Sequence, residues 1–511
     1  MMGVGAVAAW TSPALVVAVV ARVTAGGVEA PLFVLAVLAA PLLALLAEPG
    51  PRAAPSGFEF AIGLVTVACV LGAGFRAISD LGHVLGLETG AVLGSAVALV
   101  LVITVWSHPH RVAAVAVVLG AAGLVIAVGI LGVAVGASPW AVWHRVASRS
   151  AFELGPRSAW TQGGAPFLEP ITLRFTEPHQ ITAATAGVFR VTEHDRPAEV
   201  VREWRLASGE SLMLRLGDTL SIPAGARVRF EPGKRVPGSP ASGVAWADRP
   251  GTPRARLPAW WLGLTVTLAG GALMLVRPAG SLSPTAALLS PVTVLGVTLG
   301  AACWGVYAVD VAPEVSIGAP AAASLIHLVP VVADEPWRSR MLAAIVLALV
   351  ALLLASAAAL RQCLVDVGAR GGGWVAATAR RRVFGAATWS VVVVAAAAGS
   401  ALAATGWSLL LWGAGLAAAT LLGPLVATGG RPGFERARAK GVLAGGLLFV
   451  VLAASAHWLA PLHGVLDVVG QYPALVAVPG AWLVATLARA SGPSGRSGPA
   501  RAQVVAAAGR R

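Results

Sequence analysis

The chain has 511 residues, of which 57% are hydrophobic and only 12% are charged, and its formal net charge is +14. A soluble domain carries about twice that share of charged residues, so the composition excludes an ordinary soluble protein. In a membrane protein, surplus arginine sets the orientation and meets anionic lipid headgroups. The positive charge therefore does not indicate a nucleic-acid partner.

In chain order, long apolar runs predict a mainly α-helical fold, a polytopic transmembrane bundle of about twelve spans. Each run has roughly the 20 residues that a helix needs to cross a hydrocarbon core about 30 Å thick. Helices are expected because lipid offers the backbone no hydrogen-bond partners. The predicted spans are 5–22, 30–47, 57–75, 89–106, 112–136, 258–276, 285–309, 341–360, 383–404, 407–428, 441–459 and 471–488.

The stretch 313–333 is also apolar, but Pro313, Pro320 and Pro330 interrupt it. Each proline removes a backbone donor and disfavours a continuous helix. We therefore predict a re-entrant or surface-lying segment on the outer side. The alternative is a thirteenth span. It would move every later connection to the opposite side of the membrane, so the arginine-rich connections after it would lie outside.

Residues 140–256 break the apolar pattern with short alternating runs separated by turn residues, which is typical of β-strands. They predict one small exterior β-sandwich-like insert of five to seven strands, followed by a Gly/Pro-rich tether. The expected strands are 171–176, 187–192, 199–206, 211–216 and 226–231. The expected domains are 1–139 with five spans, the β-rich domain 140–256, 257–490 with seven spans, and a disordered cytoplasmic tail, 491–511.

Arginine is distributed unevenly between the two sets of alternate connections. One set holds the Arg380–Arg382 run, the 431–440 loop and the basic tail, whereas the other holds little beyond Arg76, Arg338 and Arg340. The positive-inside rule then predicts cytoplasmic termini and a periplasmic or exterior insert. Because the composition is rich in Arg, Ala, Gly, Val and Pro, as in GC-rich bacterial genomes, the expected location is a bacterial inner membrane.

The insert shows no metal or cofactor site. Gly217–Leu220, followed by a strand, is similar to part of a cupredoxin-like sandwich, but copper sites of that type need a cysteine and two histidines. The three cysteines, Cys69, Cys303 and Cys363, all lie in or beside apolar segments. His144, His179 and His194 are isolated and are predicted to be surface or turn residues. No cofactor and no metal are expected.

Ionisable residues inside the predicted spans are limited to Glu59 and His457, which argues against a proton- or cation-coupled transporter. Other polar residues gather on the predicted outer side, either as ordinary loop residues or as a site at the mouth of the bundle. The candidates for such a site are His327, His457, His463, Asp80, His83 and Asp334. Histidines there could ligate haem or a metal, but the Trp-rich signature of cytochrome c assembly proteins is absent.

Catalytic residues are unknown, because the chain has no Walker loop, His-Glu-x-x-His or Gly-x-Ser-x-Gly motif. Lipid-linked glycosyltransferases place acidic residues in an early exterior loop, yet Asp80 and Glu88 lie eight positions apart. The expected function is a non-catalytic structural or assembly subunit of an envelope or electron-transport complex. Its partners would be the lipid bilayer and other membrane or periplasmic proteins. The alternatives are a transporter of a neutral or lipid-like substrate, and an outer-face enzyme or haem-handling protein.

Overall fold

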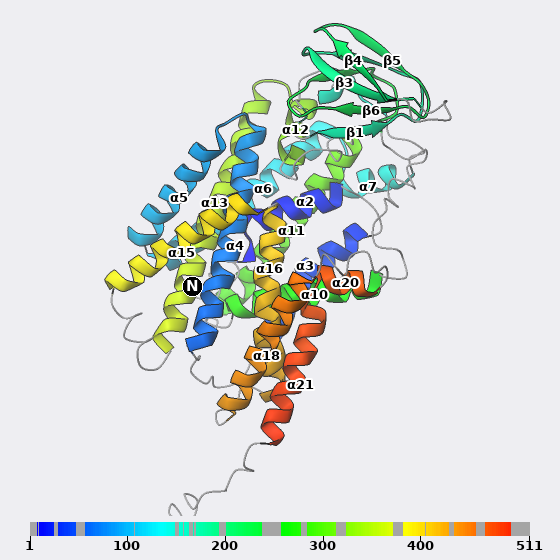
Figure 1. Cartoon of the computed structure of the whole chain (residues 1–511). Coiled ribbons are helices and arrows are strands. Elements are labelled where there is room, and N and C mark those ends of the chain that lie inside the picture. Colours follow the sequence, from blue (N-terminus) through cyan, green and yellow to red (C-terminus); the bar gives the residue numbers. More distant parts are fainter. Residues whose placement is uncertain are drawn as a thin grey trace, which may run out of the picture.

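The computed structural model shows a helical bundle with a small β-domain at one end (Figure 1). It describes residues 8, 10–24, 29–46, 57–106, 108–148, 153–156, 158–162, 167, 170–193, 201–237, 257–276, 284–312, 323–370, 382–403, 405–428, 434–455 and 465–491. The chain is thus mainly helical with a small antiparallel sheet region, as the hydrophobic pattern predicts.

The helices before the β-domain are α2 (Pro13–Thr24), α3 (Glu29–Leu46), α4 (Gly57–Val84), α5 (Thr89–Trp106), α6 (Pro109–Val135) and α7 (Pro139–Ser148), with the short α8 (Ala159–Gln162) leading into the strands. Those after it are α10 (Leu257–Val276), α11 (Pro284–Val311), α12 (Ala323–Val332), α13 (Trp337–Arg370), α15 (Arg382–Leu402), α16 (Gly406–Ala417), the π-helix η3 (Ala418–Leu422), α17 (Gly423–Thr428), α18 (Glu435–Ala454), α20 (Val465–Gln471) and α21 (Ala474–Ala490).

Seven of the described helices are long and apolar enough to cross a membrane. They correspond to α4, α5, α6, α11, α13, the continuous α16–η3–α17 and α18. Several other apolar helices are shorter, so the predicted number of twelve spans is not confirmed. The first predicted span differs most: its helix is interrupted at Thr11–Ser12, and α2 has only 12 residues. Figure 1 shows α2 running across the bundle rather than parallel to α4.

The apolar stretch 313–333 is described only from residue 323 onward, where it forms α12. With 10 residues, α12 is about 15 Å long, too short to cross a bilayer. Leu325, Leu328 and Val329 are fully buried, so this part of the stretch packs into the bundle rather than lying on its surface. Re-entry of the whole stretch stays a prediction, because residues 313–322 lie outside the described residues.

Small residues let the helices of the C-terminal block approach closely, as the glycine-rich sequence predicts. A Cβ added to Gly445 of α18 would lie 2.0 Å from the Ala419 carbonyl oxygen in η3. A Cβ added to Gly270 of α10 would lie 2.1 Å from the Ala418 Cα. These two glycines hold the π-helix between α10 and α18.

The β-domain contains two antiparallel sheets. One has the order β1 (Ile171–Arg174), β6 (Thr219–Ile222), β3 (Gly187–Thr192), β4 (Val201–Leu206), and the other has the order β5 (Ser211–Leu214), β2 (His179–Ala183), β7 (Val228–Phe230). The five predicted strands are confirmed: β3 has the predicted bounds, and the other four are shorter. The alternation of apolar residues did not predict β2, which begins at a histidine. The sequence predicts a strand after Gly217–Leu220, where β6 lies, but gives no range for it.

Alternating residues of both sheets bury one apolar cluster, with Leu173 and Phe189 from the first sheet and Ile181 and Phe230 from the second. The turn residues at 207–209 and 217–218, which separate the predicted strands, form turns, and Gly209 and Gly217 have φ angles of 87° and 91°. Such left-handed positions favour glycine because it has no Cβ. In this domain, the alternation of apolar residues and the glycines at the turns therefore predict the same strands.

The prediction that His179 is a surface or turn residue is wrong. The side chain is 1% exposed and lies in the core of the β-domain, with its ring 5.5 Å from that of Phe175 and 5.6 Å from that of Phe230. His179 Nε2 accepts a hydrogen bond of 3.1 Å from the Glu231 backbone N–H. Since a buried polar group needs a partner, this bond explains how a histidine is accommodated there. His144 is exposed as predicted, and His194 lies outside the described residues.

The β-domain is seated on the ends of α7 and α11. Val309 of α11 belongs to the same buried cluster as the strands. Beside it, the Asp310 carboxylate is 4% exposed and lies 3.8 Å from the Arg145 guanidinium of α7. The Tyr307 hydroxyl of α11 donates to the Ala137 carbonyl at 2.7 Å, just before α7 begins. The domain is therefore joined to the bundle by apolar contact with α7 and α11, and the polar groups tie these two helices to each other.

Candidate functional site

The structure describes four of the six outer-face candidates. Asp80 and His83 lie near the end of α4, His327 lies on α12, and Asp334 precedes α13. Figure 1 shows this end of α4 and α12 at the same end of the bundle as the sheets. His457 and His463 lie in 456–464, outside the described residues. Whether all six converge is therefore an open prediction.

The prediction that α4 ends near residue 75 and that Asp80 belongs to a loop is wrong. The helix continues to Val84, so Arg76 and Asp80 lie within the candidate span Phe60–Val84. Arg76 Nε is 2.9 Å from Asp80 Oδ1, and the two side chains are 31% and 22% exposed. An ion pair four positions apart neutralises both charges on one helix face, which lets the helix continue. The spans are thus less empty of charge than the sequence indicated.

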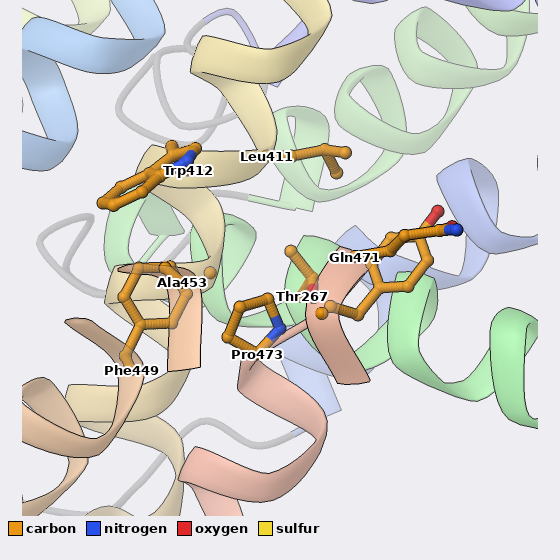
Figure 2. Close-up of a pocket in the computed structure, with 10 residues that line it drawn as sticks. Thr267, Leu411, Trp412, Phe449, Ala453, Gln471 and Pro473 are labelled. Carbon is orange, nitrogen blue, oxygen red and sulfur yellow. The ribbon is translucent and has the colours of Figure 1, made fainter. Parts of the chain in front are cut away.

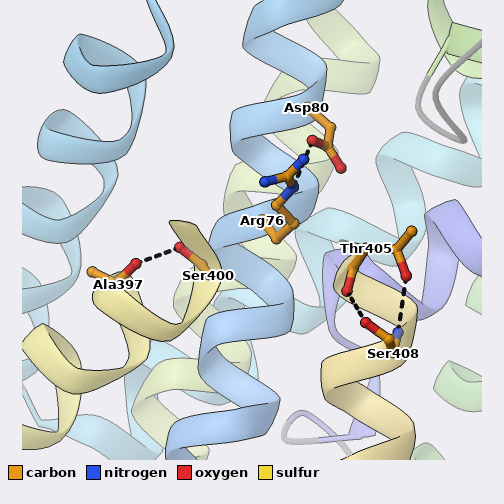
Figure 3. A network of polar contacts seen from close by, with 6 residues as sticks. All are labelled: Arg76, Asp80, Ala397, Ser400, Thr405 and Ser408. Atoms are coloured by element: carbon orange, nitrogen blue, oxygen red, sulfur yellow. Dashed lines mark hydrogen bonds and ion pairs between the residues drawn. The ribbon is translucent and has the colours of Figure 1, made fainter. Parts of the chain in front are cut away.

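Two close contacts hold this part of α4 between α15 and α16. A Cβ on Gly72 would lie 2.8 Å from the Ala396 carbonyl oxygen, and one on Gly406 would lie 2.8 Å from that of Ala73. Figure 3 shows the Arg76–Asp80 pair on α4, with the end of α15 on one side and the start of α16 on the other. The ion pair therefore lies where α15 and α16 meet α4.

The hydroxyl groups beside the pair are engaged in local bonds. Ser400 Oγ donates to the Ala397 carbonyl at 2.6 Å, and Ser408 Oγ donates to that of Thr405 at 2.7 Å. Thr405 Oγ1 also accepts from the Ser408 N–H at 3.1 Å, capping α16 (Figure 3). These bonds stabilise helix ends, and they do not form a nucleophile–base arrangement.

The other outer-face candidates have separate surroundings. His83 is exposed, and His327 is half-buried on α12. The Asp334 carbonyl accepts from the N–H groups of Trp337 and Arg338, at the start of α13. Among the described residues, no three His, Cys, Asp or Glu side chains converge closely enough to hold a metal ion.

Replacing Asp80 by asparagine is expected to destabilise the protein by on the order of 1 kcal/mol, because Arg76 loses its ion-pair partner inside a candidate span. Replacing both residues by leucine should cost less than Arg76→Leu and Asp80→Leu added together. Apparent melting temperatures in detergent would measure the coupling. If the double variant loses as much stability as the two single variants together, the pair contributes no interaction energy.

A second polar cluster, which the sequence did not indicate, lies where α5, α13 and α15 meet. Arg361 of α13 donates through Nη1 to the Thr104 carbonyl. The Trp389 indole N–H donates to Thr104 Oγ1 at 2.8 Å, and that threonine is fully buried. The predicted span 341–360 ended just before Arg361, whereas α13 continues to Arg370. The cluster ties the end of α5 to two longer helices.

A pocket of about 380 Å³, including its open mouth, lies between α10, α16, α18 and the α20–α21 junction (Figure 2). Its walls are mostly apolar and aromatic, and none of the six outer-face candidates is among the lining residues. The lining residues are Thr267, Leu411, Trp412, Gly415, Phe449, Ala453, Gly470, Gln471, Tyr472 and Pro473.

Compared with known protein families and with curated proteins, the chain has no match. The functional argument therefore rests on the geometry of the chain itself. That geometry comprises an ion pair within a span, a β-domain fixed to the bundle, and an apolar pocket.

Proposed function

We propose that this membrane protein is a non-catalytic structural or assembly subunit of an envelope complex, and that it presents its β-domain to a partner. In this proposal the chain crosses a bacterial inner membrane about twelve times. The two sheets form an exterior β-sandwich, and both termini are cytoplasmic. The arginine asymmetry of the connections supports this orientation. The position of α21, which ends at the opposite end of the molecule from the sheets, also supports it (Figure 1).

The observation that carries the proposal is the exposure of strand β4. Among the described strands it pairs with β3 alone, so its other edge has no strand beside it. Its first five residues, from Val201 to Arg205, are all exposed. An exposed strand edge is a template for pairing with another chain. On β4, Val201 and Trp204 add exposed apolar side chains between the charged Arg202, Glu203 and Arg205.

The register of β4 indicates what a partner would contact. Trp204 is opposite Phe189, whose side chain is fully buried, so Trp204 points toward the inner side of the sheet. It is nevertheless 39% exposed. A strand added along β4 would gain main-chain hydrogen bonds and would cover this indole. We therefore propose an extended segment of another envelope protein as the partner.

Photo-crosslinking in native membranes tests this proposal. A photoreactive amino acid at Val201 or Trp204 is expected to capture one protein in stoichiometric amounts. The matched control is Thr172, an exposed residue on β1 at the other edge of the same sheet. Trp204→Ala should reduce co-purification of the captured protein at least severalfold while the chain remains folded. A chain that purifies from native membranes without a stoichiometric partner, and that crosslinks equally from Thr172 and Val201, would contradict the proposal.

Transport of a neutral or lipid-like substrate is the second candidate function. The pocket between α16 and α18 favours it, because both helices belong to candidate spans. Movement of lipid between leaflets by the purified chain in liposomes, without any partner, would favour transport over the subunit role.

A further inference from the structure

The pocket between α10, α16, α18 and the α20–α21 junction has the composition of a site for a neutral amphiphile. None of its lining residues carries a charge. Two aromatic rings on one side, Trp412 and Phe449, meet edge to face with centroids 5.4 Å apart (Figure 2). Ligand pockets typically combine such apolar walls with a few polar groups that fix orientation.

The surroundings of the pocket indicate what can reach it. Trp412 is 49% exposed at the pocket. On the neighbouring α18, Leu447 and Val450 are exposed large apolar residues. Both α16 and α18 belong to candidate membrane spans, so this surface is suited to contact lipid. Membrane lipid is therefore available to the pocket at high local concentration.

Thr267 supplies an unsatisfied polar group in the pocket wall. This residue of α10 is 2% exposed, and its hydroxyl has no hydrogen-bond partner among the described residues. A buried hydroxyl without a partner is destabilising, and a ligand carbonyl could accept its hydrogen bond. The exposed Gln471 offers a second neutral polar group. These groups suit an ester or amide rather than an ionic headgroup.

The space in the pocket depends on a glycine and lies next to the π-helix. A Cβ on Gly415 would lie 2.7 Å from Phe449 Cε2, so a side chain there would displace the aromatic wall. The π-helix η3 begins at Ala418, within a turn of Gly415. Short π-helical segments inside α-helices are frequent at functional sites. The π-helix therefore begins within one turn of a residue that lines the pocket.

We propose that this pocket binds a neutral diacyl lipid. One hydrocarbon chain packs against Trp412 and Phe449, and an ester carbonyl accepts from the Thr267 hydroxyl. The site goes beyond the proposed subunit role and does not depend on it, because the β-domain contributes no residue to the pocket.

The test uses the full chain in phosphatidylcholine vesicles with a photoactivatable diacylglycerol as the probe. Labelling is expected in α16 near Trp412 and in the segment 470–473, and unlabelled diacylglycerol should compete. Ala453→Trp, which fills the pocket, should lower this labelling at least fivefold. The matched control is Ala454→Trp, because Ala454 is exposed and is not part of the lining. This control should leave the labelling unchanged.

Thr267→Val keeps the shape of the side chain and removes the hydroxyl. It should weaken competition by diacylglycerol roughly fivefold, as expected for one lost hydrogen bond. This variant also tests the site if Ala453→Trp fails to fold. Labelling that spreads over all lipid-facing helices, or that neither variant reduces, would overturn the proposal. Failure here would leave the crosslinking at β4 unaffected, so the two proposals are distinguishable.

Discussion

Replacing Gly445 or Gly270 by valine is expected to disrupt the packing of the π-helix η3 and to lower the stability of the whole chain. In both cases the new Cβ would lie within about 2 Å of backbone atoms of η3, 2.0 Å for Gly445 and 2.1 Å for Gly270. Ordinary contacts between carbon atoms lie at about 3.5–4.0 Å, so the helices would have to separate. Overpacking typically costs about 1–3 kcal/mol, and we expect the upper end of this range because backbone must move.

The apparent melting temperature in detergent would show the loss, measured as the fraction of monodisperse protein that remains after heating. Gly399→Val on α15 is the matched control, because a Cβ there meets nothing within 4 Å. It introduces the same β-branched residue into a helix without the contact. A drop in melting temperature as large for Gly399→Val as for Gly445→Val would show that helix propensity, rather than close packing, is responsible.

Acidification is expected to destabilise the β-domain through His179. Burial lowers the pKa of His179 below its usual value, and Lys234 acts in the same direction, while Glu231 and Glu177 partly oppose the shift. The hydrogen bond from the Glu231 N–H requires an unprotonated Nε2 as acceptor, which agrees with this direction. The unfolded chain, with a histidine pKa of about 6.5, therefore binds a proton more readily than the folded domain.

The stability contributed by neutral His179 is fully present above about pH 6.5 and is lost as the pH falls toward the lower folded pKa. Over that window the loss approaches about 1.4 kcal/mol per pH unit. Hydrogen exchange of β2 and β7 in the full chain, corrected for intrinsic exchange rates, would report it. His179→Gln keeps an acceptor without a titrating group and should flatten the pH dependence. His144→Gln, at an exposed site on α7, should leave the pH dependence unchanged. An unchanged acid sensitivity in His179→Gln would rule out His179 as the cause.

The candidate site was only partly predictable, because its members are polar residues whose surroundings come from other helices. The sequence singled out Asp80 but assigned it to a loop, since Arg76 looked like a helix end. Its i to i+4 pairing with Arg76, together with the contacts of Gly72 and Gly406, keeps this segment helical and packed. No local pattern reports such contacts. Asp80 lies within α4, whereas Asp334 precedes α13. Their shared position on the predicted outer side therefore did not show that they form one site.

The sequence by itself determined the class of the protein. Apolar run length and alternation are local properties, and they were enough to indicate membrane-type helices, five of the strands and the glycine turns of the β-domain. Tertiary structure alone decided the burial of His179, the contact of Val309 with the core of the β-domain, and the π-helix held between Gly270 and Gly445. It also decided the pocket, whose walls come from four separate segments of the chain. These features depend on which surfaces meet in space, and hydrophobic periodicity specifies that a face is buried without specifying against what.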